Sequence, residues 1–330
     1  MLNRVCKLMA LAVLAATASV AAGAQSISTV IPFTAPTHGI SVDPVRNIIY
    51  VVAPQPGGQT VNLAVINGST NTVTTTIPLT VGASFPAVDY LANRIYVTGC
   101  DTQIHPAPCI VTVIDGNTDT VVTTIPVTTT AGRGLTGITV NPLSGLVYVA
   151  NASDDVIDII NGRRAKLLNS ISLNGNRPRA IALNPILNLL YVPYGTSQTA
   201  VVDAWTKQIL TTTTFGTSTA GAAVNVFTGN VFVTDDEVNG PSLTGVLNVT
   251  GTPVTSVTVG DEPLGVDVDP FTNLAFVADP LDQEIFVING SNNTLQTTVV
   301  GVPADYVAVN PTTQLVYASG QIGVTVLTEK

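Results

Sequence analysis

Short apolar runs separated by turn residues recur along the whole chain. The stretch 39–79 holds four such runs, with the phrases Val-Asp-Pro, Ile-Tyr-Val and Val-Ile-Asn-Gly. The stretch 265–300 repeats them as Val-Asp-Pro, Ala-Phe-Val and Val-Ile-Asn-Gly. Self-similarity with a period of roughly 40–50 residues is the signature of a repeat architecture. Abundant Thr and Val, without long helix-forming runs, favour strands.

Seven repeats align on an aromatic residue in the second apolar run. These aromatics lie 41 to 52 residues apart: Tyr50, Tyr96, Tyr148, Tyr191, Phe232, Phe276 and Tyr317. Seven positions before each stands an Asp or Asn, and Pro follows it in five repeats: Asp43, Asp89, Asn141, Asn184, Asn225, Asp269 and Asn310. The Asx side chain caps a turn and Pro fixes φ, so this pair predicts a tight turn between the first two strands.

The four runs of a repeat, named strands A to D in chain order, differ in pattern. Runs A to C are nearly continuous in apolar residues, whereas run D alternates with Thr. Continuous apolar strands are typical of sheets that are buried on both faces. Such sheets repeated around an axis predict an all-β, seven-bladed β-propeller of four-stranded antiparallel blades over residues 25–330.

The seventh repeat runs out at Leu327, after its third strand. Residues 26–32 (Ser-Ile-Ser-Thr-Val-Ile-Pro) match the D-strand phrase of the first repeat. The N-terminal strand is therefore predicted to close the last blade and leave no open edge. We expect its apolar side chains to be buried, each contributing about 1.5–3 kcal/mol: Ile27, Val30, Ile31 and Phe33.

Residues 1–24 have the pattern of a secretory signal peptide. Arg4 and Lys7 precede a short apolar core, and Ala22-Gly23-Ala24 is an A-x-A cleavage site. The apolar core is too short to span a bilayer, so no membrane span is expected in the mature chain. The protein is therefore predicted to be exported, to the periplasm or the cell exterior.

Two cysteines remain after cleavage, Cys100 and Cys109. They bracket the predicted loop between strands B and C of the second repeat. Because exported proteins meet oxidising conditions, a disulfide between them is expected.

The composition makes nucleic acid an unexpected partner. Only 10% of the residues are charged, and the formal net charge is −9. Loss of the two basic leader residues would give 10 − 21 = −11. An acidic surface repels phosphate backbones.

The repeat phrases resemble a known family. Tyr96-Val97-Thr98 and Tyr148-Val149-Ala150-Asn151, with the Val-Ile-Asp/Asn-Gly turns, resemble YVTN-type β-propeller repeats, including periplasmic YncE-like proteins. The resemblance covers 26–327 and is weakest at 246–259, where the Asn-Gly turn is missing. It implies a secreted or periplasmic propeller. It implies no activity, since the shared residues belong to strands and turns.

The two faces of such a propeller differ in sequence. The A–B and C–D turns share one face, here called the turn face. They repeat the same turn chemistry in most blades, so we expect them to be structural, with Trp205 packed in one of them. The B–C loops and D-to-A connections share the other face, here called the loop face. These segments are irregular, and function usually resides on such loops.

A ring of varied side chains is predicted at the axis on the loop face. Five positions before each Asx come His38, Ser84, Thr136, Arg179, Ala220, Leu264 and Asp305. The candidate ligand-binding residues are the charged members and their neighbours: His38, Arg133, Arg177, Arg179, Glu262 and Asp305. One interpretation is a solvated rim. The other is a small-ligand site, with Arg179 as anion clamp and Asp305 or His38 as base.

Acidic side chains also mark the B–C loops. The weak candidates for a metal site are Asp154, Asp155, Asp235 and Asp236. They could hold a hard cation or a basic partner, or simply keep the protein soluble. Because they come from different blades, we expect them to be spread around the rim. No cofactor is expected: the chain has two histidines, and it lacks H-E-x-x-H, G-x-S-x-G and C-x-x-C motifs.

These features favour a secreted, non-catalytic, monomeric scaffold that binds a protein or small ligand through the loop face and channel mouth. The alternative is a lactonase-like hydrolytic propeller with its site at the channel mouth, an analogy at the level of fold. A third possibility, a subunit of a periplasmic redox complex, would need no cofactor of its own, since the chain lacks haem or copper ligands.

Overall fold

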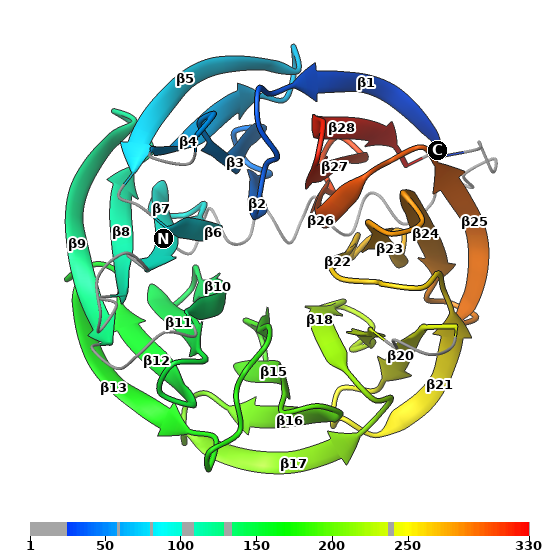
Figure 1. Cartoon of the computed structure of the whole chain (residues 1–330). Coiled ribbons are helices and arrows are strands. Elements are labelled where there is room, and N and C mark those ends of the chain that lie inside the picture. Colours follow the sequence, from blue (N-terminus) through cyan, green and yellow to red (C-terminus); the bar gives the residue numbers. More distant parts are fainter. Residues whose placement is uncertain are drawn as a thin grey trace.

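Seven four-stranded antiparallel sheets surround a central axis (Figure 1). The computed structural model describes residues 25–57, 60–79, 82–100, 109–128, 134–236 and 241–329. These ranges contain 28 strands and no helix, which confirms the predicted all-β, seven-bladed β-propeller. The predicted signal peptide, residues 1–24, lies outside the described residues.

In every blade, strand A lies nearest the axis and strand D at the outer rim (Figure 1). Blades 1 and 2 consist of β2 (Ile40–Asp43), β3 (Ile48–Pro54), β4 (Val61–Asn67) and β5 (Thr72–Leu79), then β6 (Ala83–Asp89), β7 (Arg94–Cys100), β8 (Cys109–Asp115) and β9 (Thr120–Thr128). Blades 3 and 4 consist of β10 (Leu135–Asn141), β11 (Leu146–Asn151), β12 (Val156–Asn161) and β13 (Lys166–Ser172), then β14 (Ala182–Asn184), β15 (Leu189–Tyr194), β16 (Gln198–Asp203) and β17 (Gln208–Thr214). Blades 5 and 6 consist of β18 (Thr219–Val224), β19 (Val231–Asp235), β20 (Leu243–Leu247) and β21 (Pro253–Thr258), then β22 (Val266–Val268), β23 (Leu274–Asp279), β24 (Glu284–Asn289) and β25 (Thr294–Val300). Blade 7 consists of β26 (Ala304–Asn310), β27 (Leu315–Gly320), β28 (Gly323–Thr328) and the N-terminal β1 (Ser26–Pro32).

The N-terminal strand closes the ring as predicted. β1 pairs antiparallel with β28, so the first and last described strands lie side by side (Figure 1). Ile31 is buried in the cluster between blades 7 and 1. Ile27 and Val30, however, are 42% and 39% exposed, so their expected burial is wrong. Val30 alternates with the buried Ile31, so it faces solvent on this outer strand. A register shift between Ile27 and Thr29 breaks the alternation that would otherwise place Ile27 on the same face as Ile31.

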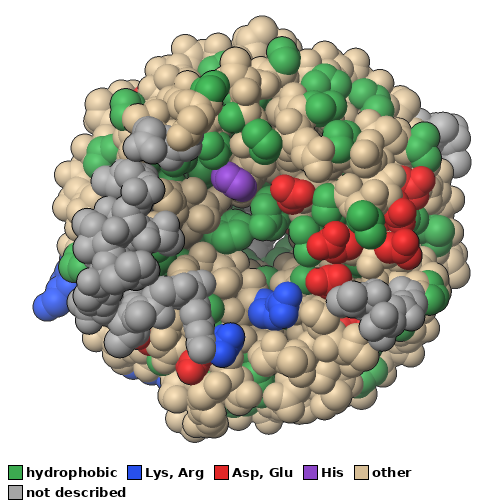
Figure 2. Space-filling model, viewed as in Figure 1, with side chains coloured by type: hydrophobic (Ala, Val, Ile, Leu, Met, Phe, Trp, Pro, Cys, Tyr) green, Lys and Arg blue, Asp and Glu red, His purple; other side chains and the backbone are tan. Residues whose placement is uncertain are grey.

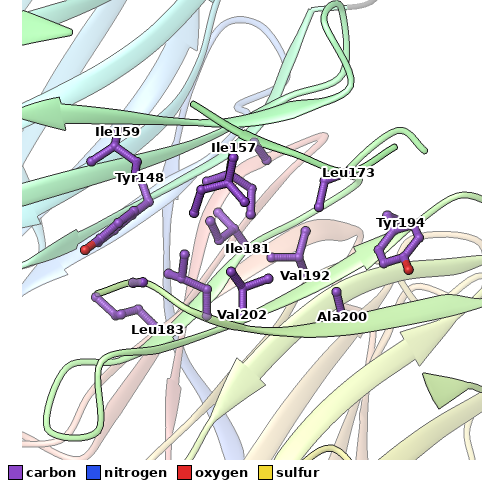
Figure 3. Packing of buried hydrophobic residues seen from close by; sticks show 14 residues of the cluster. Tyr148, Ile157, Ile159, Leu173, Ile181, Leu183, Val192, Tyr194, Ala200 and Val202 are labelled. Carbon is purple, nitrogen blue, oxygen red and sulfur yellow. The ribbon is translucent and has the colours of Figure 1, made fainter. Parts of the chain in front are cut away.

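The aromatic residues that mark the repeats form the interior between blades. All seven are fully buried: Tyr50, Tyr96, Tyr148, Tyr191, Phe232, Phe276 and Tyr317. Figure 3 shows one such cluster, in which Tyr148 and Ile157 of blade 3 lie beside Leu183 and Val192 of blade 4. The Tyr191 hydroxyl donates to the Val249 carbonyl of the next blade at 2.9 Å. These side chains therefore join neighbouring blades.

The Asx residues cap the A–B turns. Asp43 Oδ1 accepts hydrogen bonds from the backbone N–H groups of Val45 and Arg46, at 2.9 and 3.0 Å. In each of the other six blades, the equivalent side chain accepts a hydrogen bond from the backbone N–H two residues later. Asn47 has a φ of 54°, the left-handed conformation that closes the turn.

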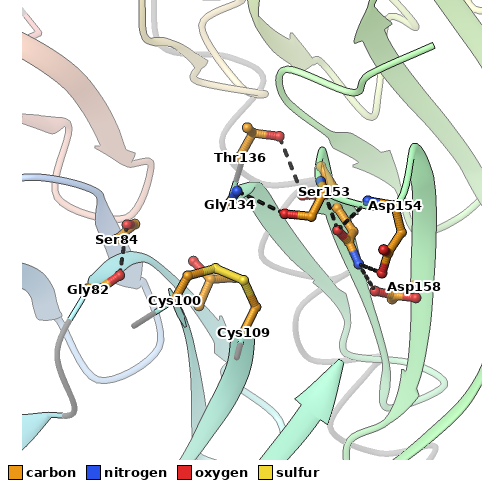
Figure 4. The surroundings of a disulfide bond; sticks show 12 residues. Gly82, Ser84, Cys100, Cys109, Gly134, Thr136, Ser153, Asp154 and Asp158 are labelled. Carbon is orange, nitrogen blue, oxygen red and sulfur yellow. Dashed lines mark hydrogen bonds between the residues drawn. A yellow bond between two sulfur atoms is a disulfide. The ribbon is translucent and has the colours of Figure 1, made fainter. Parts of the chain in front are cut away.

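A disulfide joins the ends of two strands in blade 2. Cys100 ends β7, Cys109 begins β8, and the two are register partners. Their sulfur atoms are bonded, as predicted (Figure 4). The intervening loop, 101–108, lies outside the described residues.

Candidate functional site at the channel mouth

Glycines allow the A strands to converge at the mouth of the channel. The Gly39 and Gly265 N–H groups donate to the carbonyls of Ser84 and Asp305 in the adjoining blades, each at 2.9–3.0 Å. A Cβ atom on either glycine would lie 2.4 or 2.7 Å from those same carbonyl oxygens. Any larger residue would push the blades apart, so these positions set the width of the mouth.

The convergence leaves a cavity of about 800 Å³ that opens on the loop face. Figure 2 shows the hollow at the centre of this face. Its wall is mostly apolar and includes Phe85, Ile138, Ile181, Val266 and Tyr306. The rings of Phe85 and Tyr306 meet edge to face at 5.3 Å. We call this cavity the funnel.

Two arginines line the funnel on the side of blade 4. The backbone at Arg177 and Arg179 pairs with the end of β15, through Gly195 N–H to the Arg177 carbonyl and Arg179 N–H to the Pro193 carbonyl. Both side chains are exposed, and neither forms an ion pair with an acidic side chain among the described residues. Both guanidinium groups are thus open to a ligand. Arg133, the third candidate arginine, lies outside the described residues.

Acidic groups and a histidine stand next in the chain to residues that line the funnel: His38 before Gly39, Asp305 before Tyr306, and Glu262 two positions before Leu264. Asp305, near the start of β26, is partly buried, and this burial raises the pKa of its carboxyl group while the charge of His38 opposes the shift. Burial also raises the pKa of Glu262, helped by the negative charges of Asp236, Asp279 and Asp305. Figure 2 shows the acidic side chains gathered on one side of the hollow and the basic ones on another.

The acidic gathering includes Glu262 and Asp305 together with one B–C loop carboxylate, Asp236. The loops of blades 5 to 7 bring Asp236, Glu262 and Asp305 close enough to influence one another. In the ranges that the structure describes, no three His, Cys, Asp or Glu side chains are arranged to hold a metal ion.

The four metal candidates lie in two pairs, Asp154 and Asp155 in blade 3 and Asp235 and Asp236 at the end of β19 in blade 5. Asp235 is buried and accepts the N–H groups of Thr217 and Ser218 at 2.8 and 2.7 Å. Asp154 accepts from the Asn151 side chain at 3.1 Å, and Asp155 closes its turn with a φ of 57°. Asp236, the fourth, belongs to the acidic group beside Glu262.

Hydroxyl groups at the mouth donate to backbone carbonyls. Thr136 Oγ1 donates to the Pro178 carbonyl at 2.9 Å, Ser319 Oγ to the His38 carbonyl at 2.6 Å, and Ser84 Oγ to the Gly82 carbonyl at 3.2 Å. In the described part of the mouth, none of these hydroxyls is hydrogen-bonded to the imidazole of His38 or the carboxylate of Asp305. Nucleophilic catalysis requires a hydroxyl hydrogen-bonded to a general base, and these hydroxyls do not form such a pair with His38 or Asp305.

A smaller cavity of about 290 Å³ lies along the axis and is lined by a carboxylate, Asp267, that belongs to none of the repeat motifs. Asp267 lies in β22, at a position occupied by small uncharged residues in the other blades: Ser41, Ala87, Thr139, Ala182, Ala223 and Ala308. Its oxygens accept the N–H groups of Val268 and Val309 at 2.9 and 2.8 Å. Burial nevertheless raises the pKa of Asp267 to about 6.

We expect Asp267 to make stability fall as the pH rises from about 4 to 6. An acid whose pKa is raised on folding binds more protons in the folded state, so ionising it lowers the free energy of unfolding. Urea titrations of wild type and Asp267→Asn should therefore give a stability difference that changes over this range. The asparagine variant also loses one accepted hydrogen bond, but this loss changes the stability difference by the same amount at every pH. A difference that is flat from pH 4 to 7 would show that Asp267 titrates normally.

Comparison with known proteins identifies the architecture alone. No family model matches the chain, and no curated protein matches it. Among solved structures, 1604 chains match. One is described as Kuenenia stuttgartiensis hydrazine synthase: it is 16% identical with a TM-score of 0.74, over 91% of this chain and 97% of that chain. At this identity the likeness supports the seven-bladed propeller fold and no shared chemistry.

Proposed function

We propose that this chain is an exported, non-catalytic YVTN-type propeller that binds a small dipolar ligand in the funnel. The observation that carries the proposal is the separation of charge around an apolar cavity. Arg177 and Arg179 line the cavity, and two acidic residues stand next in the chain to other lining residues: Asp305 directly before Tyr306, and Glu262 two positions before Leu264. In a chain with only 10% charged residues, such a concentration at one opening is distinctive.

Each part of the funnel matches one part of such a ligand. The two guanidinium groups suit a carboxylate or phosphate, which they can hold by paired hydrogen bonds. The carboxylates of Asp305 and Glu262 suit an amine or quaternary ammonium group. The apolar wall between them suits a hydrocarbon body, and a cavity of about 800 Å³ falls within the usual range for small-molecule sites.

Binding is favoured over catalysis because the mouth hydroxyls are committed to backbone carbonyls. Export is supported by the signal-like residues 1–24 and by the disulfide of blade 2. The repeat phrases support the YVTN-type assignment.

A thermal-shift screen tests this proposal. The probes are ω-amino carboxylates of increasing chain length, added to the mature protein. At least one length should raise the melting temperature, because a ligand that binds only the folded state stabilises it. Arg177→Gln/Arg179→Gln should abolish the shift, and Asp305→Asn should weaken it by about tenfold in affinity, as expected for one desolvated charged contact.

The matched control is Arg163→Gln/Arg164→Gln, which removes two adjacent exposed arginines from the turn face. This variant should keep the full shift. If it loses the shift as well, the effect reflects net charge rather than the funnel. Hydrolysis of a lactone or ester that depends on Arg179 or Asp305 would overturn the non-catalytic part of the proposal.

A further inference from the structure

Large apolar side chains project from the turn face in adjoining blades. Six residues of blades 3 to 6 are each between 48% and 81% exposed: Leu143, Ile186, Leu187, Trp205, Phe227 and Phe271. We call them the apolar crescent. Trp205 is the most exposed, so the expectation that it packs within its turn is wrong. The turn face is therefore less uniform than its repeated turn chemistry suggests.

The crescent contains one contact between neighbouring blades, and its side chains stand on hydrogen-bonded turns. The Phe227 and Phe271 rings of neighbouring blades lie 5.5 Å apart. Within blade 4, the Ala204 N–H donates to the Asn188 carbonyl, which joins the turn that bears Trp205 to the turn that bears Leu187. Four members, Leu143, Ile186, Phe227 and Phe271, stand two residues after an Asx cap that accepts their own N–H. Turn formation requires no apolar side chain at that position, so fold stability does not explain their presence.

Basic side chains flank the crescent. The C–D turns of blades 3 and 4 carry Arg163, Arg164, Lys166 and Lys207, all exposed. A Cβ on Gly145 would lie 3.0 Å from the Arg163 side chain, which places that arginine over the A–B turn that bears Leu143. Asp203 is the acidic side chain in these two C–D turns, and the N–H groups of Trp205 and Thr206 donate to it. A chain with a net charge of −9 thus presents a locally basic surface here.

We propose that the apolar crescent and its basic flank dock on an anionic lipid bilayer. Exposed Trp, Phe and aliphatic side chains bury at the boundary between headgroups and acyl chains, and neighbouring Lys and Arg attract anionic headgroups. A second copy of this chain fits less well, because two such faces brought together would set like charges against each other. Among the described residues no helix is long and apolar enough to cross a membrane, so contact through this face would be peripheral. The funnel would then open away from the bilayer.

Vesicle flotation tests this docking. The mature chain should float with vesicles of phosphatidylcholine and phosphatidylglycerol, float much less with phosphatidylcholine alone, and be released by salt. Arg163→Gln/Arg164→Gln/Lys166→Gln should weaken binding by about a hundredfold, since each basic residue near an anionic surface contributes roughly fivefold. Trp205→Ser/Leu187→Ser should also weaken binding by tenfold or more, through lost apolar burial.

Two controls on the loop face match these changes. Leu281→Ser removes a leucine that is 61% exposed, and Ile322→Ser removes an isoleucine that is 44% exposed. Both should float like wild type. The proposal is overturned if wild type does not float with anionic vesicles, or if the loop-face controls lose binding as much as the turn-face variants do. It is also overturned if wild type is a dimer and the crescent variants are monomers that float as well as wild type does.

Discussion

Deleting residues 26–33 is expected to lower the free energy of unfolding by about 5 kcal/mol and to cause aggregation. The deletion removes β1 and with it the buried side chain of Ile31, which contributes about 1.5–3 kcal/mol. It also removes the ladder of backbone hydrogen bonds to β28, each contributing about 1 kcal/mol net. β28 would become an exposed edge rich in valine, open to pairing with other chains. Chemical denaturation and light scattering measure the two effects.

Two single substitutions separate the contributions of the strand. Ile31→Ser should account for a large part of the loss, because Ile31 is 5% exposed between blades 7 and 1. Ile27→Ser, on the same strand but 42% exposed, should change stability by about 0.5 kcal/mol or less. A deletion variant with the stability and solubility of wild type would show that β1 does not close the ring in solution.

Replacing Cys100 and Cys109 by serine is expected to cost about 2–3 kcal/mol. The bond closes a loop whose cysteines are 9 positions apart, and in the chain-entropy model such a crosslink restricts the unfolded state by about this amount. Wild type treated with a reductant should lose about the same stability as the double variant, and the reductant should leave the double variant unchanged.

Mass spectrometry gives a separate check on this bond. Non-reduced, denatured wild type treated with an alkylating agent should gain no label at Cys100 or Cys109. Label on both cysteines would show that the mature protein carries free thiols there, whatever its stability.

The fold was predictable because each repeat encodes the same local physics. Every blade is located by an Asx residue before its A–B turn and by an aromatic residue seven positions later. In the structure the Asx residues cap these turns and the aromatic residues are buried. Ring closure followed from one missing strand at the C-terminus and one extra strand at the N-terminus. These inferences depend on pairing and burial, which repeat patterns report well.

The candidate site was predictable only in part. Counting back from the Asx residues located Arg179 and Asp305 near the axis, because position within a strand fixes depth along the channel. It missed Asp267, whose phrase Val-Asp-Val-Asp looks like ordinary strand sequence until it is compared with the same position in other blades. It also missed the exposure of Trp205, since the side chain in a turn can point inward or outward without a change in local pattern.

The closeness of Asp236, Glu262 and Asp305 was not predictable for a related reason. Sequence assigns these residues to separate segments of blades 5 to 7, whereas the structure brings Asp236 and Asp305 near enough to raise the pKa of Glu262. Distances between loops depend on the packing of whole blades rather than on any local pattern.

Isothermal titration calorimetry with three probes of equal length tests most directly whether the funnel binds a positive and a negative group at once. The probes are an ω-amino carboxylate, the alkyl carboxylate and the alkylamine. If Arg177 and Arg179 hold one end while Asp305 and Glu262 hold the other, the dipolar probe should bind at least about tenfold more tightly than either single-charge analogue, a difference of about 1.4 kcal/mol. Equal affinities for the three probes, or no binding by any length in the series, would show that the funnel does not hold a ligand at two charged ends.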